Sequence, residues 1–182
     1  MTKGRLIAVV GPSGVGKDTL MRAMVAERPG LRRVRRVITR PVDDGGEGHE
    51  PVTEAEFEAR RKEGGFALDW RAHGLRYGVP VGICMDLGAG RDLLVNLSRG
   101  VLAQAQARYP RLIVLHLTAT PEVLAARLAT RGREAAGDIA ERLEGAEMAL
   151  AEGAWPVVTL DTDAPVGRLA KRAIKLVYGV KT

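Results

Sequence analysis

Short apolar runs alternate with longer amphipathic stretches along most of the chain, and this alternation predicts its fold. Runs typical of strands lie at 6–10, 33–38, 92–97, 112–117 and 157–160. Patterns with the helical period lie at 17–28, 54–63, 99–108, 121–131, 138–151 and 166–178. Alternating strands and helices form a mainly parallel sheet that helices cover on both faces. We therefore expect a three-layer α/β fold in a single domain, which the length of 182 residues also favours.

Two regions interrupt this rhythm. Residues 40–82 hold a short helix and two short strands around Gly74, which predicts an acceptor-binding insertion between the core segments 1–39 and 90–182. Residues from about 130 to 140 join two helices through a turn that contains glycine and arginine. A turn of this composition is typical of a mobile lid over phosphate groups, so we expect an arginine lid there.

The composition narrows the environment and the partners. The single cysteine, Cys84, excludes an internal disulfide, and we expect it to be a small buried side chain in a reducing cytoplasm. No apolar stretch approaches the ~18–20 residues of a membrane span. The chain enters its first strand without a visible signal peptide. We therefore expect a cytoplasmic protein with no membrane partner.

The net charge of +6 indicates an anionic partner. The densest basic cluster is Arg32-Arg33-Val34-Arg35-Arg36, and no aromatic residue is interleaved with it. Proteins that bind single-stranded nucleic acid stack its bases on aromatic side chains, so we expect no nucleic-acid partner. A site rich in phosphate groups explains the surplus of arginine better.

A phosphate-binding loop follows the first predicted strand. The pattern Gly-x-x-x-x-Gly-Lys is complete from Gly11 to Lys17, between an apolar run and a helical pattern. Its glycines let backbone N–H groups turn toward phosphate oxygens, and Lys17 adds a full charge at the β- and γ-phosphates. The pattern departs at Asp18, where a Ser or Thr hydroxyl ordinarily contacts Mg²⁺. The predicted ATP site consists of Gly11, Pro12, Ser13, Gly14, Val15, Gly16, Lys17, Asp18 and Thr19.

Arginines near the predicted lid are candidates for catalysis. Phosphoryl transfer spreads negative charge over the oxygens of the moving group, and the forked donors of arginine suit that charge. Four arginines gather there: Arg127, Arg131, Arg133 and Arg142. We expect Arg131 and Arg142 to be catalytic together with Lys17. Arg127 can instead be a solvated residue on its helix. The four arginines together can also be an ordinary charged helix–turn–helix surface.

Residues in and beside the insertion are candidates for binding an anionic acceptor. Pro41 disfavours helix at the residue before it, which would hold Arg40 extended at the end of its strand. Arg36, His49 and Tyr77 are expected to complete a phosphate pocket around Arg40.

The chain as a whole resembles the guanylate-kinase-like branch of the P-loop kinases. The matching features are Gly11-Pro12-Ser13-Gly14-Val15-Gly16-Lys17, Ile38-Thr39-Arg40, Tyr77-Gly78 after Gly74, and Arg127-Leu128-Ala129-Thr130-Arg131-Gly132 leading to Arg142-Leu143. The chain departs from true guanylate kinases where that family holds its acceptor. The guanine-holding glutamate and serine of that family fall at Leu68 and near Arg36, and its phosphate-contacting tyrosine falls at His49.

With these departures the chain is similar to another family, the ribose 1,5-bisphosphate phosphokinases of phosphonate catabolism. The shared features cover nearly the whole chain: Gly16-Lys17-Asp18, Ile38-Thr39-Arg40, Trp70 with Ala72 and Gly74, Tyr77-Gly78-Val79, Leu94-Val95-Asn96 with Ser98-Arg99, Gln104-Ala105-Gln106-Ala107-Arg108-Tyr109, and Arg131-Gly132-Arg133-Glu134. The resemblance implies ATP-dependent phosphorylation of ribose 1,5-bisphosphate to 5-phosphoribosyl 1-diphosphate. Leu68 offers a purine no polar partner, whereas Arg36 and His49 suit an acceptor with two phosphates and no base.

The resemblance also shapes the expected metal site. The acidic pair that ends the third core strand of guanylate kinases becomes Asn96-Leu97-Ser98. Because Mg²⁺ prefers oxygen ligands, we hypothesise that Asp18 supplies the missing carboxylate and binds the metal directly or through water. Thr19 is a second candidate hydroxyl.

Two alternatives stay open at this point. One is a guanylate kinase or another nucleoside monophosphate kinase. The other is a non-catalytic guanylate-kinase-like binding module, which would explain the missing loop hydroxyl and strand-end acid. A kinase is favoured because a binding module has no physical need for one lysine and three arginines together: Lys17, Arg40, Arg131 and Arg142. The sequence leaves open whether the protein is a monomer or a homodimer.

Overall fold

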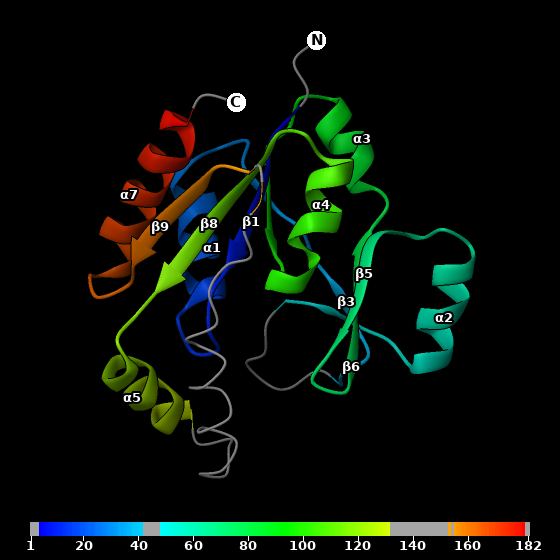
Figure 1. Ribbon diagram of the computed structural model, residues 1–182, viewed down its shortest axis with the longest axis horizontal. Coiled ribbons are helices and arrows are strands. Elements are labelled where there is room, and N and C mark those ends of the chain that lie inside the picture. Colours follow the sequence, from blue (N-terminus) through cyan, green and yellow to red (C-terminus); the bar gives the residue numbers. More distant parts are fainter. Residues whose placement is uncertain (1–3, 42–47, 132–152, 154, 181–182) are drawn as a thin grey trace.

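The computed structural model describes residues 4–41, 48–131, 153 and 155–180 (Figure 1). Its larger sheet has the strand order β2-β7-β1-β8-β9, and all of its strand pairs are parallel. The strands are β1 (Leu6–Val10), β2 (Arg32–Arg33), β7 (Leu93–Asn96), β8 (Leu112–Thr118) and β9 (Val157–Asp161). At the centre of this sheet, Ala8 pairs with Val95 on one side and Val114 on the other. The predicted parallel α/β sheet is confirmed.

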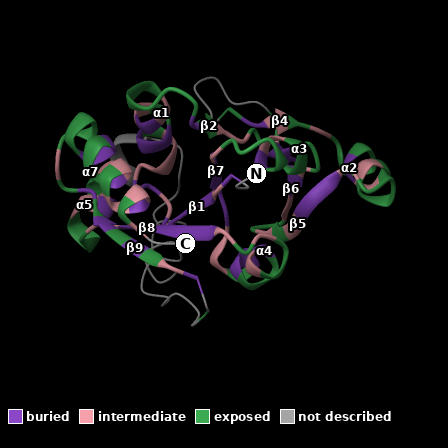
Figure 2. Cartoon of the chain, turned by 90° about the horizontal axis from the view of Figure 1, so that it is seen from above, coloured by how far each residue is buried: buried purple, intermediate pink, exposed green. Residues whose placement is uncertain are grey.

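The central strand β1 is buried on both faces, which explains why its sequence is apolar throughout. The helices are α1 (Lys17–Glu27), α3 (Ile83–Gly88), α4 (Leu102–Arg108), α5 (Pro121–Arg131) and α7 (Val166–Gly179), with a 3-10 turn η1 (Arg99–Val101). Ile7 and Val9 join a core cluster with α1 and α7. Leu6, Ala8 and Val10 join a second cluster with α3 and α4. Figure 2 shows the buried strands in purple between helices whose outer faces are green.

A second sheet lies beside the first and carries most of the predicted insertion (Figure 1). Its strands, in the order β4-β3-β6-β5, are β3 (Val37–Ile38), β4 (Glu50–Pro51), β5 (Phe66–Ala72) and β6 (Leu75–Pro80). β5 and β6 form a hairpin whose turn holds Gly74 at a φ of 70°, a value that glycine adopts at no steric cost. The helix α2 (Glu54–Lys62) covers the outer side, where the rings of Phe57 and Phe66 stack 4.5 Å apart.

The strand predicted at 33–38 is wrong as a single element. β2 pairs with β7 in the larger sheet, and the Val34 N–H still donates a hydrogen bond to the Leu94 carbonyl oxygen. The chain then crosses over, and β3 pairs with β6 in the second sheet. An alternating apolar pattern fits an edge of either sheet and does not specify its partner strand. The second sheet therefore begins at Val37, before the insertion predicted to start at residue 40.

The expectation of a buried cysteine is also wrong. Cys84 is exposed on α3, and its sulfur lies 3.5 Å from the hydroxyl oxygen of Tyr109. α3 was not predicted, because it is too short to show a helical period. It buries Ile83 and Leu87, which are one turn apart, and this leaves Cys84 on the outer side.

Some predictions lie outside the described residues. The helix predicted at 138–151 falls within the segment 132–152, as does most of the predicted lid. Within the described ranges, no helix is both long enough and apolar enough to cross a membrane.

Candidate active site

The loop between β1 and α1 has the conformation that its glycines predict. Gly14 and Gly16 have φ values of 81° and 95°, in the left-handed region that favours glycine. A Cβ atom on Gly11 would lie 2.6 Å from the carbonyl oxygen of Leu117, so only glycine fits against β8. α1 begins directly after Gly16, which brings its first N–H groups to the loop. Strand, loop and helix together form a structure of the kind that binds phosphate.

Lys17 folds back over this loop. Its Nζ donates hydrogen bonds to the carbonyl oxygens of Gly11 (2.9 Å) and Pro12 (2.8 Å). These bonds hold the ammonium group at the wall of a cleft of about 510 Å³. A full positive charge therefore lies near the carboxyl end of β1, where open α/β sheets bind their ligands.

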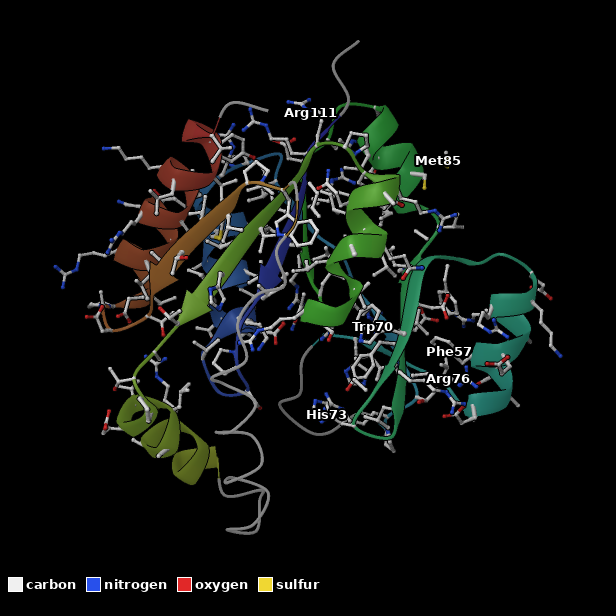
Figure 3. The ribbon with its side chains drawn as sticks, viewed as in Figure 1. Phe57, Trp70, His73, Arg76, Met85 and Arg111 are labelled. Atoms are coloured by element: carbon white, nitrogen blue, oxygen red, sulfur yellow. The ribbon has the colours of Figure 1, made fainter. Side chains whose placement is uncertain are left out.

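The cleft lies between the two sheets and is strongly cationic. The loop forms one wall, the β5–β6 hairpin forms the opposite wall, and residues after β7 close the base. Its charged lining residues are Lys17, Arg36, Arg40 and Arg99, and its described lining contains no Asp or Glu. Figure 3 shows Trp70 on the side of the hairpin that faces the larger sheet, whereas Phe57 and Arg76 lie toward α2. The arrangement suits ligands that carry several phosphate groups.

Three of the four predicted acceptor residues meet in this cleft. Arg36, Arg40 and Tyr77 all line it, and the guanidinium carbon of Arg36 lies 5.6 Å from the centroid of the Tyr77 ring. His49 is buried outside the lining, with its Nε2 3.2 Å from the carbonyl oxygen of Arg40. The structure therefore places His49 behind Arg40, where it holds the backbone that presents this arginine.

The predicted metal ligands lie at the start of α1, outside the cleft lining. The Oδ1 atom of Asp18 lies 3.4 Å from a guanidinium nitrogen of Arg33 on β2, and both side chains are partly buried. Thr19 is exposed. In this conformation the Asp18 carboxylate links α1 to the edge of the larger sheet.

The site offers few protein oxygen atoms as possible ligands for Mg²⁺. Within the described ranges, no group of three or more His, Cys, Asp and Glu residues could hold a metal ion. In kinase sites Mg²⁺ is held by one or two protein oxygens together with phosphates and water. Ser13 and the buried Asn96 line the cleft beside Lys17, and Asp18 is the nearest carboxylate in sequence. This donor set is too small for an all-protein metal cage, and it is of the oxygen type that Mg²⁺ prefers, with the Asp18 carboxylate paired to Arg33 outside the cleft lining.

Sequence reasoning missed Arg99 and Trp70 as cleft residues. Arg99 follows β7 closely, and the carboxyl ends of parallel strands carry ligand sites, so its position was a usable signal. Burial lowers the pKa of the Arg99 guanidinium. Burial and the charge of Arg99 lower the pKa of the half-buried His116, which keeps that ring neutral near pH 7.

Trp70 lies two residues after Leu68 on one strand, a spacing that puts both on the same face.

The interpretation of Arg127 as a solvated residue on its helix is wrong. Its guanidinium donates hydrogen bonds to the carbonyl oxygen of Val15 (3.2 Å), to the hydroxyl of Thr162 (2.9 Å) and to the carbonyl oxygen of Thr162 (2.6 Å). It thereby ties α5 to the phosphate-binding loop and to the end of β9. The side chain of Arg131, at the end of α5, lies outside the described residues, as do Arg133 and Arg142.

Comparisons with known proteins identify the family. No protein-family model matches the chain. A protein from Ruegeria sp. (strain TM1040) is 54% identical over 159 residues, which cover 87% of this chain and 84% of that protein. A protein from Agrobacterium fabrum is 42% identical over 174 residues, which cover 94% of both. Each is named ribose 1,5-bisphosphate phosphokinase PhnN. The chain belongs to the ribose 1,5-bisphosphate phosphokinase family.

The ribose 1,5-bisphosphate phosphokinases are kinases, so the predicted enzyme class, a phosphotransferase, is confirmed. The fold has a match among solved structures as well. A crystal structure of guanylate kinase from Anaplasma phagocytophilum superposes with a TM-score of 0.71 at 16% identity, and the match covers 100% of this chain and 89% of that one. At this identity the likeness concerns the fold alone, and it confirms the predicted guanylate-kinase-like P-loop architecture.

Proposed function

We propose that this protein transfers the γ-phosphoryl group of ATP to the 1-phosphate of ribose 1,5-bisphosphate, in phosphonate degradation. The products are 5-phosphoribosyl 1-diphosphate and ADP. The observation that carries the proposal is the cleft whose described lining holds four cationic side chains and no carboxylate. Donor and acceptor phosphates must approach each other there, and fixed cations offset their repulsion. The names of the relatives supply the identity of the acceptor.

On the donor side, the loop from Gly11 to Thr19 holds the triphosphate. Its backbone N–H groups and the dipole of α1 bind the phosphate oxygens. Lys17, held by its two hydrogen bonds to the loop, places its charge on the β- and γ-phosphates. Arg127 bonds to the Val15 carbonyl oxygen and keeps the loop in shape.

Mg²⁺ would be held by Asp18, directly or through water, with Ser13 and Asn96 as neutral oxygen donors nearby. When bound, the metal neutralises charge that develops on the β- and γ-phosphate oxygens. Asp18 is oriented by Arg33, 3.4 Å away, and a metal and this arginine would compete for the same carboxylate.

On the acceptor side, Arg36 and Arg40 bind phosphate oxygens and Tyr77 offers its hydroxyl. The attacking atom is an oxygen of the 1-phosphate, which is largely deprotonated at neutral pH because its second pKa is about 6. A strong general base is therefore unnecessary, in keeping with a described cleft lining that has no Asp or Glu. The new bond joins this oxygen to the γ-phosphorus, and the bond from that phosphorus to the β–γ bridging oxygen breaks.

The remaining parts of the proposal concern the lid and the state of the protein. Arg131 and Arg142 are proposed to close over the transferring phosphoryl group from the lid at about 130–140. The second sheet with α2 serves as the acceptor lobe of a single kinase domain. The protein acts in the cytoplasm as a monomer or a homodimer, without nucleic-acid or membrane partners.

The test supplies the purified protein with Mg²⁺–ATP and, in parallel, ribose 1,5-bisphosphate or GMP. We expect ADP and 5-phosphoribosyl 1-diphosphate from the sugar and no turnover of GMP. Product identity is read by mass spectrometry or phosphorus NMR, because ADP alone would not exclude ATP hydrolysis. Turnover of GMP instead of the sugar would contradict the proposal and indicate a nucleoside monophosphate kinase.

A further inference from the structure

A stacked aromatic pair occupies the acceptor side of the cleft. Trp70 of β5 and Tyr77 of β6 are paired directly across the hairpin. Their ring centroids lie 5.3 Å apart at an interplanar angle of 8°. Both residues line the cleft, and Figure 3 shows Trp70 on the side of the hairpin that faces the larger sheet. The indole is therefore part of the cleft wall.

The indole is held in place from several sides. A cross-strand aromatic pair fixes both of its rings. Trp70 also packs against the core cluster that contains Leu68 and Val79. The guanidinium carbon of Arg36 lies 5.6 Å from the Tyr77 ring centroid and adds a cation–π contact to the pair. A ring with these neighbours cannot turn away from Tyr77 without losing its stacking and core contacts.

The hairpin wall offers a nucleobase few polar partners. Recognition of a base needs polar groups that match its edge. Trp70 covers a face of Tyr77, and Ala72 and Leu75, which line the same wall, have no polar side-chain atoms. His73 lines the cleft from the turn of the hairpin. The wall instead presents a rigid apolar surface on which the carbon face of a sugar can pack, while its phosphates reach the cationic groups of the cleft.

We propose that Trp70 determines the class of acceptor. Stacked on Tyr77, its indole occupies the part of the cleft that the base of a nucleoside monophosphate would need, and it leaves room for a base-free sugar phosphate. This inference rests on the proposed function and names the residue that selects the substrate. Leu68 cannot make this selection by contact, because it is 1% exposed and does not line the cleft.

The test compares graded replacements of Trp70 with a matched control. Trp70→Phe removes part of the indole and Trp70→Ala removes all of it. Trp155→Phe changes the second of the two tryptophans, which is buried in the same core cluster but does not line the cleft. Thermal unfolding shows which variants fold, and Trp70→Phe keeps the test valid if Trp70→Ala does not fold.

The readout is the affinity for GMP, measured by calorimetry with a non-hydrolysable ATP analogue in the donor site. We expect Trp70→Ala to bind GMP at least about tenfold more tightly than wild type, with Trp70→Phe in between and Trp155→Phe unchanged. Ribose 1,5-bisphosphate should displace the bound GMP. A GMP affinity within about twofold of wild type in every folded Trp70 variant would overturn the inference, as would an equal gain in Trp155→Phe.

The Trp70 binding test and the turnover test of the proposed function can fail independently of each other. The Trp70 series measures nucleotide binding and needs no turnover. The proposed function fails if the wild-type protein transfers no phosphoryl group to ribose 1,5-bisphosphate, whatever the Trp70 variants bind.

Discussion

The two walls of the cleft are built in different ways. The wall proposed for the donor consists of Gly11, Pro12, Ser13 and Lys17, which belong to one continuous loop with a single lysine. The acceptor wall is made of side chains such as Arg36, Trp70 and Tyr77, which come from separate strands and adjoining turns of the second sheet. A backbone loop holds any phosphate in much the same way, whereas side chains on a sheet can be exchanged singly. In the proposed function, the chemistry common to P-loop kinases belongs to one wall and the choice of acceptor to the other.

The largest loss is expected on the donor wall. Lys17→Met removes the positive charge proposed to contact the transferring phosphates, and kcat should fall by about 100-fold or more. Steady-state kinetics with both substrates saturating measure this loss. Lys171→Met is the control, since that lysine is exposed on α7 and pairs only loosely with Glu27 at 3.7 Å. If the kcat of Lys17→Met stays within about threefold of wild type, the proposed catalytic role of Lys17 is wrong.

A change on the acceptor wall should separate the two substrates. Arg36→Ala removes a buried guanidinium from the cleft, and the KM for the sugar phosphate should rise by about 10–100-fold, since hydrogen bonds to charged groups contribute about 1.5–3 kcal/mol. The KM for ATP should stay near its wild-type value. Arg35→Ala is the neighbouring control, because Arg35 is exposed and donates to the His49 carbonyl oxygen outside the cleft. Equal rises in both KM values would break the division between the walls.

A smaller effect is expected where α1 meets β2. Asp18→Asn keeps the shape of the side chain but removes its charge, so the Mg²⁺ concentration for half-maximal rate should rise by about tenfold. Arg33→Ala keeps the carboxylate and removes only its partner at 3.4 Å, so Mg²⁺ dependence should not weaken.

Magnesium titrations of the rate, with thermal unfolding of both variants, distinguish the two roles of Asp18. If Asp18→Asn keeps near-normal kcat and Mg²⁺ dependence, the metal hypothesis is wrong. Asp18 would then serve only to anchor β2, with an effect on stability of at most about 1 kcal/mol, as for other solvent-accessible ion pairs.

The smallest effect is expected at the amino end of β7, the end of this strand away from the cleft, and it should leave both walls unchanged. Burial, followed by a hydrogen bond to Asp92, raises the pKa of Tyr178 to about 12. Its contribution to stability should be present below pH ~10, the usual tyrosine pKa, and should be lost as the pH rises from there to about 12. Thermal unfolding at a series of pH values should show a steeper alkaline loss in wild type than in Tyr178→Phe. Parallel curves for the two proteins would contradict this assignment.

Much of the larger sheet was predictable because its signals are local. The apolar runs at 6–10 and 112–117 correspond to β1 and β8, since a strand buried on both faces must be apolar throughout. Gly16, the second glycine of the motif, and Gly14 supply the left-handed backbone of the loop, and both glycines are visible in the sequence. The hairpin turn at Gly74 was found for the same reason.

Other features depend on partners that are distant in the chain. The run at 33–38 divides between two sheets, because its pattern does not encode which strand it will meet. His49 was expected in the cleft and lies behind Arg40, since burial depends on what packs over it. The stacking of Trp70 on Tyr77 requires a hairpin register that composition does not reveal.

By itself, the sequence determined the α/β class, the phosphate-binding loop and the family, because these rest on periodicity, backbone stereochemistry and shared motifs. Only the tertiary structure decided which side chains form the acceptor wall, which residue Asp18 contacts, and that Cys84 is exposed. The physical reason is that a loop of consecutive residues forms its own phosphate site. A wall of side chains from separate strands exists only after the second sheet has packed against the first.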